Sequence, residues 1–186
     1  MKIYSDAVAP AGEQEICVTC GLCCDATLYM HANLQPGERG NLPLKIEAVS
    51  VTEGGKDFFR LPCGYFSGSC TIYDCQRAEV CSTYRCKLLG MYAGGEISRE
   101  DALRTVSEAV AMRDSILDEY RRLTGRDASA GFRRIPVELG QMLKDGIADE
   151  TVAGAYEMLL VRCNILEALL IKVFMADEEF EKYVMK

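Results

Sequence analysis

The chain has 186 residues, of which 49% are hydrophobic and 26% are charged. This composition is typical of a globular protein that buries a hydrophobic core, so disulfides are not needed merely to hold the chain together. The formal net charge of -7 argues against non-specific nucleic-acid binding and against electrostatic docking on anionic membranes, because both require a basic surface.

Neither end of the chain suggests targeting to a membrane. Residues 1–6 contain no apolar signal-peptide core, and the most apolar stretch, residues 158–174, is broken by charged side chains. We therefore expect a cytoplasmic protein with no membrane partner. In a reducing compartment, ten cysteines favour metal binding over structural disulfides, which stay the alternative if a signal peptide has been removed.

The first predicted element is the cysteine motif C-x-x-C-x-x-C-C, made by Cys17, Cys20, Cys23 and Cys24. Two-residue spacing lets successive thiolates converge on one ion while the intervening amides donate hydrogen bonds to sulfur. Gly21 suits a tight metal loop, because glycine adopts a positive φ at little cost. The side chains of adjacent Cys23 and Cys24 should diverge, which favours two centres, or a polynuclear one, over a single zinc ion.

The segment after this motif has weak structural signals. Residues 34–45 contain proline and glycine turn signals, and short strands are predicted within residues 45–52 and 58–61. His31 is the only histidine. A surface position is favoured for it over metal ligation or proton transfer.

A second group of cysteines follows and comprises Cys63, Cys70, Cys75, Cys81 and Cys86. Joining the two groups closes a loop of about forty residues, whose entropic cost grows only slowly with length. A zinc tetrathiolate site contributes on the order of 10 kcal/mol or more, which offsets that cost. Four cations are candidates for moderating the thiolate charge: Arg60, Arg77, Arg85 and Lys87.

Together the two groups resemble the YkgJ-like family of zinc- or iron-chelating cysteine-cluster domains. Cys63 precedes Gly64-Tyr65-Phe66, the segment 70–74 matches Cys-x-Ile-Tyr-acidic, and the segment 77–81 matches Arg-Pro-x-x-Cys with Ala78 in place of the proline. Cys86 stands at the expected last position, and the match covers residues 17–87.

The resemblance implies a ligand set of eight cysteines. These are Cys17, Cys20, Cys23, Cys24, Cys63, Cys70, Cys81 and Cys86, hereafter the pattern cysteines. Cys75 lies outside the pattern and is predicted to be a free or auxiliary thiol. Asp25 and Asp74, which adjoin the motifs, are predicted to cap turns instead of binding metal.

The second half of the chain predicts helices. Ser98 and Asp101 form a capping box before a periodic apolar run that Gly125 ends. A shorter helix is predicted from Pro136 to Gly146, and a long one from about Asp149 to the acidic tail. The long helix carries an apolar stripe that includes Cys163, which predicts either a bundle core or a homodimer seam.

We therefore expect a mainly α protein, with an irregular cysteine-rich metal-binding module packed on a C-terminal bundle of about three helices. The predicted module spans residues 1–95 and the helical region residues 96–186, as one globular unit. The lone histidine disfavours Ser-His-Asp or Cys-His catalysis, and no phosphate-binding loop is found.

Three functions remain open at this stage. The first is a protein holding iron–sulfur or zinc centres for redox chemistry or metal handling, with iron–sulfur slightly favoured because every ligand is sulfur. The second is a metal-dependent enzyme that modifies a protein or a small molecule. The third is a structural zinc module that presents a helical surface to a protein partner or to a second copy of the chain.

Overall fold

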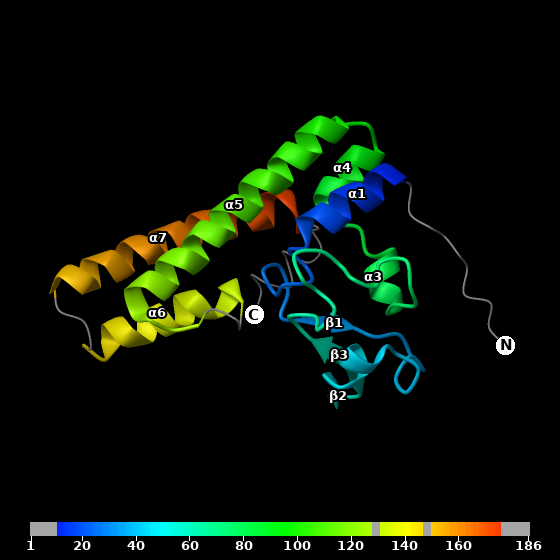
Figure 1. The fold of residues 1–186 in the computed structure, drawn as a ribbon, viewed down its shortest axis with the longest axis horizontal. Coiled ribbons are helices and arrows are strands. Elements are labelled where there is room, and N and C mark those ends of the chain that lie inside the picture. Colours follow the sequence, from blue (N-terminus) through cyan, green and yellow to red (C-terminus); the bar gives the residue numbers. More distant parts are fainter. Residues whose placement is uncertain (1–10, 128–130, 147–149, 176–186) are drawn as a thin grey trace.

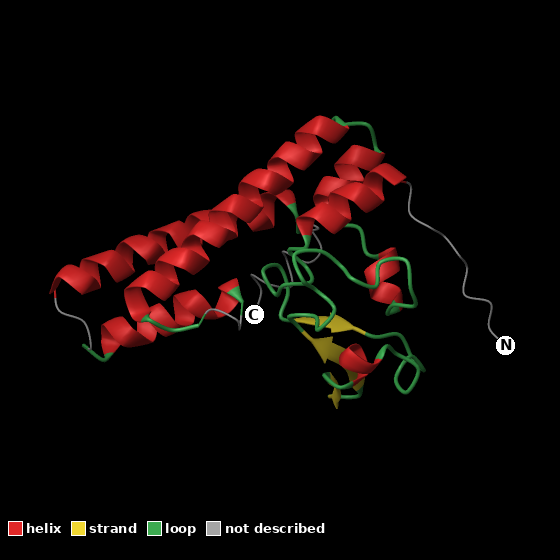
Figure 2. Ribbon diagram, in the orientation of Figure 1, coloured by secondary structure: helices red, strands yellow, loops and turns green. Residues whose placement is uncertain are grey.

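The fold is mostly helical, and the computed structural model describes residues 11–127, 131–146 and 150–175. Within these residues the helices are α1 (Ala11–Cys20), α2 (Leu44–Glu47), α3 (Glu79–Thr83), α4 (Lys87–Ala93), α5 (Arg99–Thr124), α6 (Ile135–Lys144) and α7 (Glu150–Val173). A small sheet contains β1 (His31–Asn33), β2 (Ser50–Glu53) and β3 (Lys56–Arg60), and a 3-10 helix spans Phe132–Arg134. Figure 2 shows the long helices on one side of the molecule and the sheet, with a short helix beside it, on the other. The predicted mainly helical class is confirmed.

The longest helix, α5, begins and ends where its local sequence predicts. The Ser98 hydroxyl accepts a hydrogen bond from the Asp101 amide over 3.0 Å, and Gly125 adopts a left-handed conformation with φ of 66°. The serine thereby pairs one of the amides that a helix start leaves unsatisfied, and the glycine ends the helix without Cβ strain. Both predicted boundaries of this helix are confirmed.

Helix α7 packs against both α5 and α6 around apolar side chains (Figure 1). Helix α6 begins at Ile135, with Pro136 in its first turn, as predicted. The predicted start of the last helix at Asp149 and the acidic tail after it lie outside the described residues.

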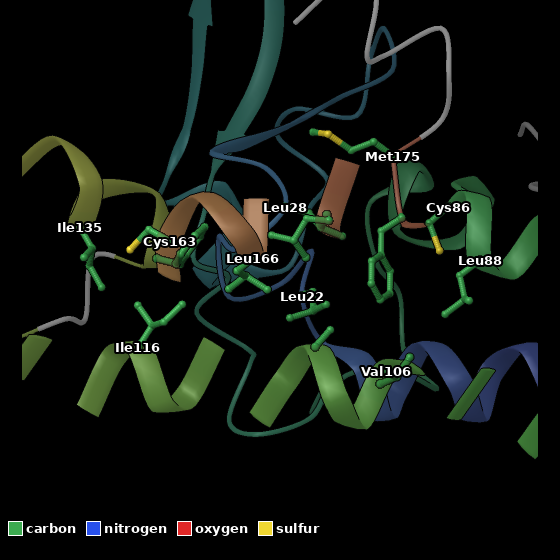
Figure 3. Packing of buried hydrophobic residues seen from close by; sticks show 14 of the residues in the cluster. Leu22, Leu28, Cys86, Leu88, Val106, Ile116, Ile135, Cys163, Leu166 and Met175 are labelled. Atoms are coloured by element: carbon green, nitrogen blue, oxygen red, sulfur yellow. The ribbon is translucent and has the colours of Figure 1, made fainter. Parts of the chain in front are cut away.

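The predicted apolar stripe of α7 faces the core. Its central members are at most 7% exposed, and they are Tyr156, Leu159, Cys163, Leu166 and Leu170. In Figure 3, Cys163 lies beside Ile135 of α6 and well apart from Cys86. The stripe is therefore buried within the chain, as part of the helical core. These side chains cannot form a dimer seam, because they are already buried inside a single chain.

The sheet is antiparallel in the order β1-β3-β2. Phe59 of the central strand β3 lies opposite Ala32 of β1 on one side and opposite Ser50 of β2 on the other. The predicted strand over residues 45–52 is wrong in its first part, which forms α2. The Pro43 carbonyl accepts hydrogen bonds there from the amides of Ile46 and Glu47 at 2.9 and 3.0 Å. Pro43 is the N-cap residue of α2, with φ of -54° and ψ of 139°, and its carbonyl begins a helical turn where the residue pattern suggested a strand.

Two hydrophobic cores result, and the cysteine segments lie between them. The helical core is centred on α5, α6 and α7 and extends to Leu22, Leu28 and Cys86. Cys20 and Cys23 pack against it. The sheet core consists of Leu34, Ile46, Phe59 and Ala78, with Cys63 packed against it. None of the helices in the described part of the chain is long and apolar enough to span a membrane.

Replacement of Ser98 by alanine should lower the free energy of unfolding by about 1 kcal/mol, because the α5 start loses its side-chain acceptor. Urea denaturation followed by circular dichroism measures this change. The control is Ser107→Ala at an exposed position inside the same helix, which should be neutral or slightly stabilising. Equal effects of the two substitutions would contradict the assigned cap.

Candidate metal centre

The first cysteine motif begins on a helix and ends in a turn. Cys17 and Cys20 lie three residues apart in α1, so their side chains emerge on one face of that helix. Helix α1 ends at Cys20, and Gly21 follows with a φ of 62°. The Gly21 carbonyl then accepts hydrogen bonds from the Cys24 and Asp25 amides at 2.8 and 3.1 Å. The positive φ predicted for Gly21 is confirmed, whereas the helical start of the motif was not predicted.

Direct contacts join the first motif to the second group of cysteines. The Cys63 amide donates a hydrogen bond of 2.7 Å to the Cys24 carbonyl. The Phe66 ring packs so closely over Gly21 that a Cβ on that glycine would lie 2.4 Å from a ring carbon. Gly21 is therefore required twice, once for its backbone conformation and once for the space that Phe66 occupies.

The second group comes from short turns and helix starts. The Phe66 amide donates to the Cys63 carbonyl over 2.9 Å, and a bridge pairs Phe66 with Cys70. Cys81 lies in α3, where its amide donates to the Ala78 carbonyl over 3.0 Å. Cys86 is the N-cap residue of α4 and is buried.

The two cysteine groups meet at this junction through the Cys24–Cys63 hydrogen bond and the packing of Phe66 on Gly21. Electrostatic interactions between thiols link every pattern cysteine to at least one other. Cys75 is exposed at the end of a turn, and Cys163 is buried in the helical core.

Burial makes these thiols hard to ionise. It raises the pKa of Cys20 and of Cys81 to about 12, and the negative charge of neighbouring thiolates adds to the effect. Burial also raises the pKa of five others, namely Cys17, Cys23, Cys24, Cys63 and Cys86. Such thiols stay protonated near neutral pH, so any metal that binds them has to displace their protons.

Positive side chains lie beside the thiols. Arg77 and Arg85 act against burial and lower the pKa of Cys17, and Arg77 does the same for Cys81. The Arg77 guanidinium stacks 4.1 Å from the centroid of the Tyr73 ring. Two of the four predicted cations therefore face the cysteines, whereas Arg60 reaches Glu53 on the sheet at 3.5 Å.

One cation near the cysteines was missed by sequence reasoning. Lys45 lowers the pKa of Cys63, and its ammonium donates a hydrogen bond of 3.0 Å to the Gly64 carbonyl. The same ammonium lies 5.1 Å from the centroid of the Tyr65 ring. No spacing in the sequence signals this contact, because α2 brings Lys45 to the second cysteine group only through tertiary folding.

Asp25 anchors the end of the first motif. Its carboxylate accepts a hydrogen bond of 2.8 Å from the Thr27 amide, which confirms the predicted turn cap. The same carboxylate is paired with Arg113 of α5. These two interactions engage the Asp25 carboxylate oxygens. His31 is exposed on β1, as favoured, with its ring 4.9 Å from that of Phe58.

A small cavity of about 50 Å³ adjoins the thiols of the first motif. Its cysteine lining is Cys17, Cys20, Cys23, Cys24 and Cys86, and the rest is mainly apolar side chains of the helical core. No trio of His, Cys, Asp or Glu side chains in residues 11–127, 131–146 and 150–175 already stands in a geometry that holds a metal ion. Thiol donors fit a soft metal. To bind such a metal, the thiols would have to reorient from the positions they have here.

Comparison of the chain with protein families, with curated proteins and with solved structures finds no match. The resemblance to cysteine-cluster domains therefore stays a prediction that depends on the motifs themselves.

Replacement of Gly21 by alanine should destabilise the protein more than the same change at Gly37. Both glycines have positive φ, 62° and 87°, but a Cβ at Gly37 has nothing within 4 Å. Each substitution costs about 1–2 kcal/mol for the left-handed backbone, and only Gly21→Ala also displaces Phe66. Urea denaturation measures both. An equal loss of stability would contradict the close packing of Phe66 on the motif.

Proposed function

We propose that the protein holds thiolate-bound metal, as iron–sulfur or zinc, on the eight pattern cysteines. The observation that carries this proposal is the direct contact between the two cysteine motifs. The Cys24 carbonyl accepts a hydrogen bond from the Cys63 amide, and five of the pattern cysteines line one small cavity, whereas Cys163 is buried in the helical core. A metal ion that displaced the thiol protons would bind several of these thiolates at once.

The local sequence supports the same function. Gly21 has the conformation that a tight metal-binding turn requires, and Arg77 and Arg85 face Cys17, where thiolate charge would accumulate. All ten cysteines are free thiols, which suits a reducing compartment, so the proposed location is the cytoplasm. The proposed architecture is a cysteine-rich module packed on the C-terminal helices.

The choice between the two metals leans towards iron–sulfur. Every pattern ligand is sulfur, and the cavity beside five of the cysteines is lined mainly by apolar side chains. A bound iron–sulfur cluster would supply one-electron chemistry, and a closed zinc site would supply structure. In either case this chain provides the thiolates, nearby cations and an apolar wall that limits the access of water.

A second candidate function is a structural zinc module that presents a helical surface to a partner protein or to another copy of the chain. The outer side of α7 favours it, because Met158, Val161 and Ile165 are 64%, 50% and 55% exposed. Their spacing places them on one face of that helix. This face differs from the buried stripe of the same helix.

Protein purified without oxygen should contain bound metal. A brown colour with visible absorbance, iron and acid-labile sulfide would select iron–sulfur, whereas stoichiometric zinc without iron would select the structural module. Elemental analysis and a visible spectrum of the same preparation make the measurement. Protein that remains metal-free after anaerobic reconstitution with iron and sulfide, and separately with zinc, would refute the proposed function.

Replacement of Cys24 by serine should lower the metal content substantially, because the thiol lies at the meeting point of the two cysteine groups. The matched controls are Cys75→Ser, in the same cysteine-rich half, and Cys163→Ser, in the helical core. Both controls should retain the metal content of the unmodified protein. Equal metal loss in all three variants would show that the pattern cysteines have no special role.

A further inference from the structure

Helix α7 carries a second stripe of residues, separate from the one that faces the helical core. The members of this outer stripe are all exposed and uncharged, and they are Gly154, Met158, Val161, Ile165 and Ala168. The core stripe of the same helix, from Tyr156 to Leu170, contains none of them. Helix α7 therefore has two apolar stripes, of which only one is buried in the chain.

This outer stripe contrasts with the exposed face of the other long helix. Helix α5 exposes mostly charged side chains, among them Arg104, Glu108, Asp114 and Asp118. Single exposed apolar residues are ordinary on a protein surface, whereas several that adjoin one another mark an interaction site. The outer stripe of α7 therefore has the character of an interface and not of a solvated face.

The spacing of the outer stripe indicates what kind of element covers it. Its members recur at alternating steps of four and three residues, which is the 3.5-residue period of helices that pack along one another. From Gly154 to Ala168 the stripe is about 21 Å long. A second copy of α7 carries the same period, so its side chains would fit between those of the first along the whole stripe.

Charges beside the outer stripe favour the same partner. Glu157 precedes Met158 on one edge of the stripe, and Arg162 follows Val161 on the other edge. In a parallel pair of such helices, the first of these positions faces the residue five places later on the second helix. Glu157 of each chain would then lie opposite Arg162 of the other chain. Two ion pairs of opposite charge result.

Arg162 is accessible for such a pair although it has partners in its own chain. Its guanidinium donates a hydrogen bond of 2.7 Å to the Ser115 hydroxyl and lies 3.8 Å from the Glu119 carboxylate, yet 35% of its side chain is exposed. A guanidinium has five N–H donors, so these contacts leave donors for a further carboxylate.

From the outer stripe and the charges beside it, we infer that the protein forms a parallel homodimer through the outer face of α7. The inference rests on the helical surface of the second candidate function and gives that surface a partner. It does not depend on metal binding.

A parallel dimer has a consequence for the cysteines. Phe174, directly after α7, lines the cavity beside the thiols, and its carbonyl accepts a hydrogen bond of 3.1 Å from the Lys87 amide at the start of α4. Figure 1 shows this end of α7 near α1 and α4, whereas the start of α7 lies at the far end of the helices. Parallel pairing therefore places the two cysteine junctions at the same end of the dimer.

Sedimentation equilibrium over a range of protein concentrations tests the homodimer. The unmodified chain should exchange between monomer and dimer. Val161→Glu should raise the dimer dissociation constant by at least about tenfold, because the two new carboxylates would be buried against each other. The matched control is Val137→Glu on α6, where the valine is 72% exposed and the next exposed residues of the helix are Gln141 and Lys144. The control should leave the dimer unchanged.

Charge reversal tests the parallel orientation. Glu157→Lys would place an ammonium opposite Arg162 of the second copy, so the dimer should weaken several-fold, and added salt should then partly restore it. The control with the same change of charge is Glu108→Lys on the exposed face of α5, which should have no effect on the dimer. A dimer that Val161→Glu weakens and Glu157→Lys leaves unchanged would overturn the parallel arrangement.

Three results would overturn the homodimer itself. A chain that stays monomeric at every concentration would leave the outer face to a different protein. A dimer that Val161→Glu does not weaken, or that Val137→Glu weakens equally, would use another surface. Circular dichroism checks the folding of each variant. If Val161→Glu is unfolded, Ile165→Glu decides in its place, because Ile165 lies on the same stripe and is 55% exposed.

Metal analysis of the same preparations keeps this inference apart from the proposed metal binding. A monomer that holds metal would refute the homodimer alone. A dimer that stays metal-free after anaerobic reconstitution would refute metal binding alone, since the outer stripe of α7 contains none of the pattern cysteines.

Discussion

The junction between residues 21–24 and 63–66 is the constraint on which the rest of the cysteine-rich half depends. There the Cys63 amide is hydrogen-bonded to the Cys24 carbonyl, and the Phe66 ring covers Gly21. These contacts close a chain segment that includes the whole small sheet. Because the closing contacts are backbone groups and a glycine, they hold the thiols near one another even before any thiol is deprotonated.

Burial has two opposing effects at this junction. It raises the pKa of the thiols, which disfavours the thiolates that a metal needs, and it also excludes water that would compete for the metal. Arg77, Arg85 and Lys45 partly offset the first effect through their positive charges. Stable ionisation of these buried thiols would therefore need a bound cation, as the proposed metal would supply.

Local signals made the long helices predictable, whereas tertiary contacts determined most of the rest. Ser98 and Gly125 mark the ends of α5 through interactions within a few residues, so the sequence alone located them. Helix α1 was missed because its cysteines hide the apolar periodicity, with Ile16 its only large aliphatic side chain that is fully buried. The spacing of the cysteines suggested the candidate site, but the position of Lys45 beside Cys63 depends on α2 and was beyond sequence reasoning.

The C-terminal helices contribute to the candidate centre by holding the end of the first cysteine motif. Arg113 of α5 pairs with Asp25 where both side chains are largely buried, and Arg133 donates to the Thr27 carbonyl over 3.1 Å while it also pairs with Glu167 of α7. Removing one partner of such a pair leaves a charge without compensation, which costs more than the pair contributes. Residues 25–27 are thus held by α5 and by the segment before α6, and through Arg133 they are tied to α7. Since Cys23 and Cys24 immediately precede them, the directions of these two thiols depend on helix packing far away in the sequence.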